Sequence, residues 1–187
     1  MKNLVLFASL FLLVAFAAYA FWARARKRPM SGASRYDTYL GLRDLALHMD
    51  RTKAGLPVPS TASEPWGAIM DWGMDKGTAT VVAFSDGSAS IYLSSGGGFL
   101  GGAQTNESVR EAAKGMVVAA TASLPQTHPT TAYPLPQKGE VIFYVLTDKG
   151  VLTASAAEVE LRNNRHPLSK LGAAAQDVIS QYRHVAP

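Results

Sequence analysis

The first hydrophobic run in the chain extends from Leu4 to Trp22 and is interrupted only by Ser9 and Tyr19. A helix over these residues is about 28 Å long at 1.5 Å per residue, which is close to the thickness of a bilayer core. The run therefore predicts a transmembrane anchor over residues 1–23.

A secretory signal peptide is the alternative interpretation, because Ala18-Tyr19-Ala20 has the small-x-small pattern that precedes a cleavage site. Cleavage after Ala20 would export the rest of the chain. A basic cluster directly follows the apolar run: Arg24, Arg26, Lys27 and Arg28. Cations on this side resist translocation and attract anionic headgroups, so the pattern favours an uncleaved single-pass signal-anchor with a cytoplasmic domain.

Residues 24–33 then form a short basic linker, and residues 34–187 are expected to form one domain. Ser34 and Asp37 predict the start of a helix. Its apolar face has helical spacing and comprises Leu42, Leu45, Ala46 and Met49.

From Trp66 onward the hydrophobic period is two, which predicts strands over residues 66–74, 78–84 and 88–93. Asp75-Lys76-Gly77 and Asp86-Gly87 are hairpin turn sequences, so the three strands form a meander. Alternation places Trp66, Met70 and Trp72 on one face and Asp71 on the other. We expect Asp71 on a solvated face. A buried Asp71 with a raised pKa, able to act as an acid or base, is the alternative.

A helix is predicted over residues 105–124, followed by an extended proline-rich connection over 124–139 and a second hairpin formed by 140–147 and 151–155. Ser155 and Glu158 predict a capping box for a short helix, and a last amphipathic helix follows Pro167. The order predicts an α+β domain: a five-stranded antiparallel sheet made of a three-strand meander and a hairpin, with a helix between them and C-terminal helices.

The net charge of +4 prompts a nucleic-acid hypothesis, which the distribution of charge removes. Six of the 18 cations lie in the first 35 residues, so the chain from Tyr36 onward carries 12 cations and 14 acids. A domain with a charge of about −2 has no footprint for a phosphate backbone.

The Gly-rich segment between the third strand and the next helix is the one place where a ligand site is suggested. It contains Gly96, Gly97, Gly98, Gly101 and Gly102. Glycines there permit close backbone approach to a phosphate or carboxylate, but the segment lacks the spacing of known phosphate loops. A packed crossover loop and a partner-binding loop are the alternatives.

No other motif predicts chemistry, and we expect no catalytic residue, metal site or cofactor. The chain lacks cysteine, and its four histidines have no metal-ligand spacing. The sequence thus favours a non-enzymatic, membrane-anchored interaction or accessory domain that binds a membrane-associated protein. An anionic-ligand-binding or enzymatic domain that uses Gly96 to Gly102 is the second hypothesis. A polar pocket beside that segment would favour the second, and an exposed apolar patch the first.

Overall fold

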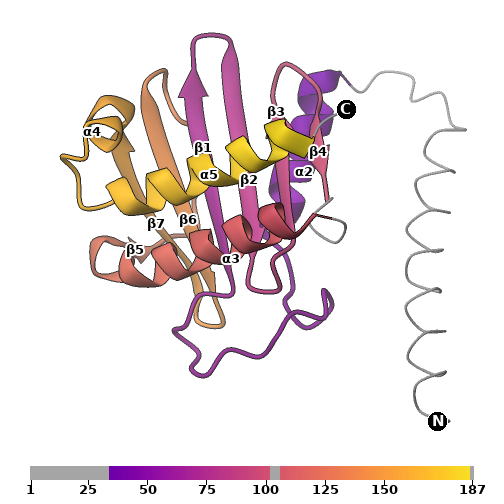
Figure 1. Ribbon diagram of the computed structural model, residues 1–187, viewed down its shortest axis with the longest axis vertical. Helices are drawn as coiled ribbons and strands as arrows, with labels where there is room; N and C mark the ends of the chain where they lie inside the picture. The colour runs from indigo at the N-terminus through magenta and orange to yellow at the C-terminus, as the bar shows by residue number, and fades with distance from the viewer. Residues whose placement is uncertain (1–33, 102–105, 186–187) are drawn as a thin grey trace, which may run out of the picture. The chain divides into compact units, whose positions relative to one another are not determined.

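The computed structural model describes residues 34–101 and 106–185 (Figure 1). The predicted anchor, the basic linker and Gly102 lie outside the described residues. Residues Arg35–Pro187 form one compact unit. Among the helices of the described ranges, none has both the length and the apolar character that crossing a membrane requires.

The unit is an α+β domain. Its elements, in chain order, are α2 (Arg35–Leu47), β1 (Gly67–Met74), β2 (Gly77–Phe84), β3 (Ala89–Leu93), β4 (Gly98–Leu100), α3 (Glu107–Ala122), the 3-10 turn η1 (Leu124–Gln126), β5 (His128–Pro129), β6 (Glu140–Thr147), β7 (Gly150–Ala157), α4 (Glu158–Arg162) and α5 (Ser169–Val185).

The sheet has seven strands in the order β4-β3-β2-β1-β6-β7-β5, and every pairing is antiparallel. The prediction of five strands was therefore wrong in number, although the meander, the second hairpin and the intervening helix are confirmed. The two additional strands, β4 and β5, have only three and two residues and lie at the two edges of the sheet. Such short segments contain no hydrophobic alternation that a sequence pattern could reveal.

Helices α3 and α5 cover one face of the sheet and pack against each other (Figure 1). The buried side chains of α3 are those that the helical period predicts: Val109, Ala112, Ala113, Met116, Val117 and Ala120. They join Met70, Val81 and Phe143 of the sheet in the larger of two apolar cores. Asn106 caps α3, because its side-chain oxygen accepts hydrogen bonds from the amides of Ser108 and Val109.

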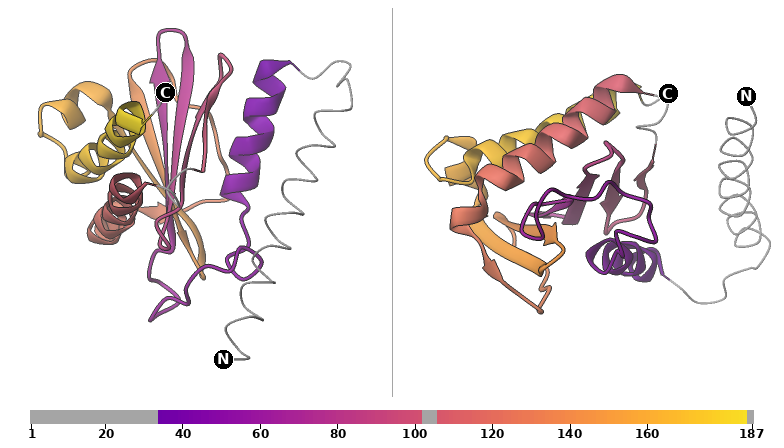
Figure 2. Two further views of the ribbon diagram at one scale, coloured as in Figure 1. Left: turned by 45° about the vertical axis from the view of Figure 1, so that its right-hand side comes forward. Right: turned by 90° about the horizontal axis from the view of Figure 1, so that it is seen from below.

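Helix α2 covers the opposite face of the sheet, so the domain has three layers (Figure 2). Its buried side chains are Tyr39, Arg43, Ala46 and Leu47. The predicted apolar face was only partly correct, because Leu45 is 63% exposed and Arg43 is buried in its place. Trp66 also belongs to the core beneath α2 and not to the Met70 face, since it lies at a bend before β1, where strand alternation does not apply.

The predicted capping box at Ser155 was wrong. Strand β7 continues to Ala157, and Ser155 pairs with Ile142 in the ladder. Ala157 occupies the N-cap of α4 and makes no side-chain capping hydrogen bond. Continued pairing with β6 keeps Ser155 in extended backbone, two residues before the N-cap position of α4.

Candidate functional site

The glycines of the Gly-rich segment form a tight turn and part of a strand. Gly96 and Gly97 lie between β3 and β4, Gly98 is the first residue of β4, and Gly101 directly follows that strand. All four have positive φ, from 71° at Gly101 to 140° at Gly98. The segment is thus not a loop throughout, because Gly98 begins a strand that pairs with β3.

Two of these glycines are needed for close packing. A Cβ atom on Gly98 would overlap the carbonyl oxygen of Ile91 on the neighbouring strand. A Cβ on Gly96 would lie 2.7 Å from the Cδ of Arg35, at the start of α2. Gly97 faces open space. The β3–β4 turn thus packs directly against the first turn of α2.

A groove of about 240 Å³ runs between α2 and this turn. Its lining residues are Arg35, Thr38, Tyr39, Leu42, Ile91, Tyr92, Leu93, Gly96, Gly97, Gly98 and Leu100. Most of these side chains are apolar or aromatic, and Arg35 at one end is the only charged residue among them. The groove is therefore suited to an apolar side chain or segment.

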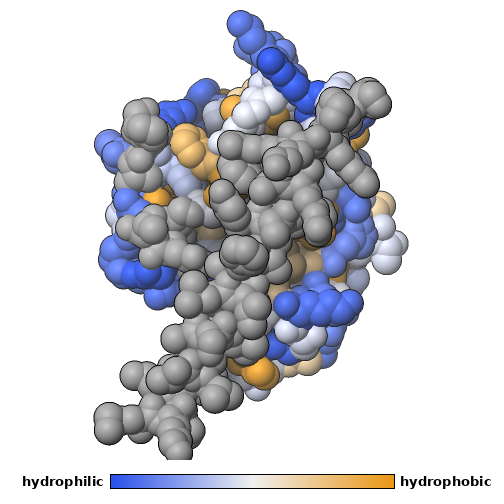
Figure 3. All heavy atoms as spheres, turned by 90° about the vertical axis from the view of Figure 1, so that its right-hand side faces the viewer, coloured by the Kyte–Doolittle hydropathy of each residue, from blue (hydrophilic) through white to orange (hydrophobic). Residues whose placement is uncertain are grey.

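Leu100 of β4 continues this apolar surface to the edge of the sheet, whereas Phe99 lies on the opposite face of the strand, toward α5. Leu100 is 62% exposed, and Phe99 is 36% exposed while its ring stacks on Tyr182 at a centroid distance of 5.2 Å. The hydroxyl of Tyr182 lies within hydrogen-bond distance of the carbonyl oxygens of Ala89 and Gly101 and shares its single proton between them, which connects β3 and the end of β4 to α5. In Figure 3, which faces this side of the domain, hydrophobic residues appear as small patches among hydrophilic ones.

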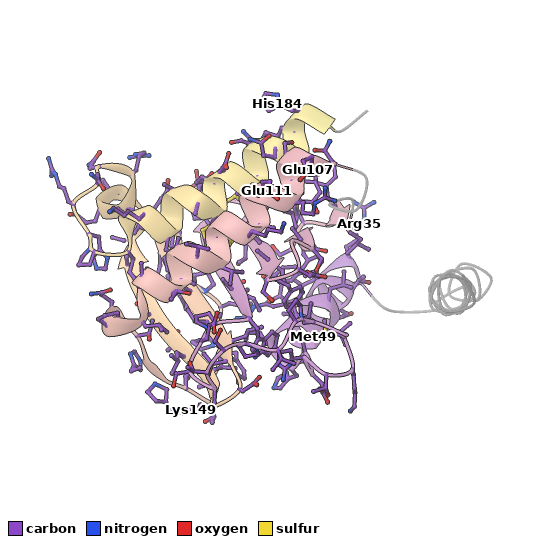
Figure 4. The ribbon with its side chains drawn as sticks, turned by 60° about the horizontal axis from the view of Figure 1, so that its bottom comes forward. Arg35, Met49, Glu107, Glu111, Lys149 and His184 are labelled. Atoms are coloured by element: carbon purple, nitrogen blue, oxygen red, sulfur yellow. The ribbon has the colours of Figure 1, made fainter. Side chains whose placement is uncertain are left out.

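Two backbone donors near the turn already have partners. The amide of Gly96 donates to Leu93, and the amide of Gly101 donates to the Ser90 hydroxyl. At the start of α3, Asn106 takes the first free amides and Glu107 adds a negative charge. Arg35 and Glu107 lie at the same end of the domain (Figure 4), but no residue of α3 lines the groove. The anion-binding hypothesis stays a prediction, and the surroundings of the glycines offer it few donors.

A buried polar network lies beneath α2 and is centred on Asp71, the residue that the sequence analysis placed on a solvated face. Asp71 of β1 has no solvent exposure, and its carboxylate accepts from Arg43 Nε at 2.7 Å. The second carboxylate oxygen accepts from the Thr80 hydroxyl at 2.5 Å. Since this uses the single proton of Thr80, the Tyr39 hydroxyl must be the donor in its 2.9 Å contact with Thr80.

Arg43 extends this network to the proline-rich connection. Its guanidinium donates to the carbonyls of Tyr133 and Pro134 at 3.1 and 3.0 Å. The Tyr144 hydroxyl donates to Pro134 as well, and its ring lies 5.6 Å from the guanidinium carbon. Arg43 therefore joins three separate segments of the chain: α2, the centre of the sheet and the connection before β6.

Burial determines the protonation behaviour of this network. Loss of solvent raises the pKa of the Asp71 carboxyl, while the guanidinium of Arg43 and the hydroxyl of Thr80 oppose the rise. Burial also raises the pKa of Tyr39 and of Tyr144 to about 12. With every acceptor of Asp71 occupied by a protein donor and no surface exposure, the arrangement is suited to holding the fold together.

The expectation of a solvated Asp71 was therefore wrong, and the burial and raised pKa of the alternative interpretation are confirmed, while its role as an acid or base stays a prediction. Its partner Arg43 was missed, although it lies one turn after Tyr39 and one turn before Leu47, on the face that becomes buried. The sequence does contain a signal for this pair: Arg43 lies within an otherwise apolar helical face, and Asp71 lies within a strand. A buried charge of one sign requires a partner of the other.

Within residues 34–101 and 106–185, no three His, Asp or Glu side chains are grouped so that they could hold a metal ion. The basic residues predicted at the membrane surface, Arg24, Arg26, Lys27 and Arg28, lie outside these ranges. No protein-family model, curated protein or solved structure matches the chain.

Proposed function

We propose that the chain is a single-pass, membrane-anchored interaction domain without enzymatic activity, which holds a membrane-associated protein partner at the groove between α2 and the β3–β4 turn. The observation that carries the proposal is the apolar lining of this groove together with the exposed Leu100 at its end. This surface can bind an apolar group of a partner, while the amides of Gly96 and Gly101 already donate to acceptors within the domain.

The partner is expected to bind as an extended segment that adds to β4. In the part of the chain that the structure describes, β4 ends the strand order and has β3 as its only neighbour. Strand addition would supply main-chain hydrogen bonds, and the groove would receive alternate side chains of the added segment.

The position of the groove supports a partner at the membrane. Arg35 lines the groove and directly follows the proposed anchor and linker. Ten linker residues, 24–33, extend to at most about 35 Å. A tether of this length would allow the groove to reach juxtamembrane segments of membrane proteins, which is the reason for proposing such a partner.

Photo-crosslinking of the full chain in native membranes tests the docking surface. A photoreactive amino acid at Leu100 should crosslink to one defined segment of one membrane-associated protein, and the same group at Val118 of α3, which is 70% exposed, should not. Thr38→Trp fills the groove and should abolish the crosslink. Leu45→Trp, on an exposed position of the same helix outside the groove, should leave it unchanged.

Equal crosslinking from Leu100 and Val118, products with lipid alone or with a second copy alone, or insensitivity to Thr38→Trp would each contradict the proposal.

Orientation is tested separately by protease protection in spheroplasts. We propose a cytoplasmic domain, which external protease should not digest. Digestion, or a mature N-terminus at Phe21, would instead support export after cleavage at Ala20.

A further inference from the structure

A second hollow lies far from the groove along the sheet, between β1, β6 and the two C-terminal helices. Its volume is about 480 Å³, which is within the range of small-molecule sites. The lining residues are Met70, Trp72, Val141, Glu158, Leu161, Arg162, Gly172, Ala173 and Gln176. We call it the Trp72 pocket.

The floor of the Trp72 pocket is apolar and rigid. Met70 and Val141 are 1% and 3% exposed and belong to the main core. Leu161 of α4 forms one wall, and Gly172 of α5 lies next to it, since a Cβ on this glycine would be 3.5 Å from the Leu161 side chain, an ordinary contact distance. Core side chains thus leave a space unfilled between the sheet, α4 and α5.

The rim carries one oriented carboxylate. Trp72 Nε1 donates to Glu158 Oε2 at 3.0 Å, which fixes both side chains across the boundary between β1 and α4. The other oxygen of Glu158 faces Arg162 at 3.5 Å, one turn along α4. The Arg162 side chain is 69% exposed, so this ion pair is weak and a stronger or closer cation can replace it.

An apolar cavity that ends at an indole ring and a carboxylate favours a flat apolar body with a cationic head. The ring system occupies space above Met70 and Val141, and an ammonium group pairs with Glu158. An anionic head would be repelled by Glu158, and a neutral alcohol would keep a hydrogen bond to the carboxylate but lose the attraction between opposite charges.

We propose that the Trp72 pocket binds small aromatic amines, with Glu158 recognising the ammonium group and Trp72 orienting that carboxylate. The proposal is independent of the groove beside β4, because the two sites share no residue. Arg162 acts as a competitor for Glu158 and lowers the affinity of the empty pocket for the amine.

Naphthylmethylamine is the probe, and naphthylmethanol and naphthoate are its neutral and anionic counterparts. The full chain in nanodiscs contains three tryptophans, Trp22, Trp66 and Trp72, so nitrogen-15 indole labelling gives three signals. The signal absent from Trp72→Phe belongs to Trp72. It should shift on titration with the amine, more weakly with the alcohol and not with naphthoate, while the Trp66 signal stays in place.

Four variants test the assignment. Ala173→Phe places a ring over the exposed entrance and should weaken amine binding at least about tenfold, a loss of about 1.4 kcal/mol. Ser180→Phe, exposed on the same helix outside the pocket, should have no effect. Glu158→Gln retains an acceptor for Trp72 but should remove the preference for the amine over the alcohol, and Arg162→Gln should strengthen amine binding.

The proposal is overturned if the Trp72 signal does not respond to the amine, or if the response persists unchanged in Ala173→Phe. Equal binding of the amine, alcohol and carboxylate would also overturn it, because that result would indicate an unselective apolar surface. Partition of the probe into lipid affects wild type, Ala173→Phe and Ser180→Phe alike, so their difference reports the pocket alone.

Discussion

Replacing Arg43 by Met should be among the most destabilising single changes in the domain. Arg43 and Asp71 are 7% and 0% exposed at their side chains and 2.6 Å apart, so the change leaves an isolated buried carboxylate. Removal of one partner from a buried ion pair costs about 3–5 kcal/mol. A domain of this size has a total free energy of unfolding of roughly 5–15 kcal/mol, so the variant should be folded but much closer to its transition.

A matched control exists in the same protein. Arg51 binds Asp148 through two hydrogen bonds of 2.9 and 3.1 Å, a geometry comparable to that of the buried pair. The Asp148 side chain is 32% exposed, however, and water can solvate it when the arginine is lost. Arg51→Met should therefore cost only about 1 kcal/mol or less.

The cost of Arg43→Met should depend on pH in a defined direction. Burial already raises the pKa of Asp71, and loss of the guanidinium removes the main group that opposes this rise. The folded variant then holds a proton that the unfolded chain releases near the ordinary value of 3.8. Its free energy of unfolding should fall as pH rises from this value toward the raised pKa, so the difference from wild type grows with pH.

Urea titrations followed by tryptophan fluorescence at several pH values measure these quantities. Arg43→Met with Asp71→Leu removes both charges, so the double variant should lose less stability than the two single variants together, with a coupling of about 1–3 kcal/mol. Equal costs for Arg43→Met and Arg51→Met, or strict additivity in the double variant, would refute the role assigned to the buried pair.

Three further predictions concern the turn, the domain boundary and the buried tyrosines. Gly98→Ala should cost at least about 3 kcal/mol in thermal or urea unfolding, because its Cβ meets Ile91, while Gly97→Ala should cost only about 1 kcal/mol for positive φ in open space; equal costs would contradict the geometry. Residues 34–187 should fold without the preceding segment, since two apolar cores lie within the described part of this range, and calorimetry without a cooperative transition would disprove this. Burial raises the pKa of Tyr39, Tyr144 and Tyr182 to about 12, so ultraviolet absorbance should show that these phenols ionise above the ordinary pKa of 10.0. The free energy of unfolding should fall as the pH rises above 10.0, because the unfolded chain then releases these protons first. Normal titration of all tyrosines in the folded state would contradict their burial.

The hydrophobic periodicity of the sequence predicted the longer helices and strands. It missed the two short strands that form only by pairing with distant parts of the chain. The buried face of α3 matches its 3.6-residue pattern, and β6 has the predicted bounds, Glu140–Thr147. Strands β4 and β5 depend on pairing with distant segments, β3 and β7, and no local pattern encodes them.

The buried polar network beneath α2 was missed for a related reason. Arg43 and Asp71 each look like surface residues when considered alone, and burial becomes tolerable only when the fold brings them together. The Trp72 pocket is a similar case, because hydrophobic alternation correctly predicts Trp72 on the Met70 face but cannot show that α4 leaves space above it.

The placement of β1 has a consequence for synthesis of the protein. β1 lies in the middle of the sheet, and its residue Gly67 pairs with Leu146 of β6, which leaves the ribosome long after the meander is complete. Until then, the β6-facing edge of β1 has no strand to pair with, and its apolar side chains lie beside it. Nascent chains halted before β6 should therefore be prone to aggregation or to chaperone binding, and this tendency should disappear once β6 has emerged and paired.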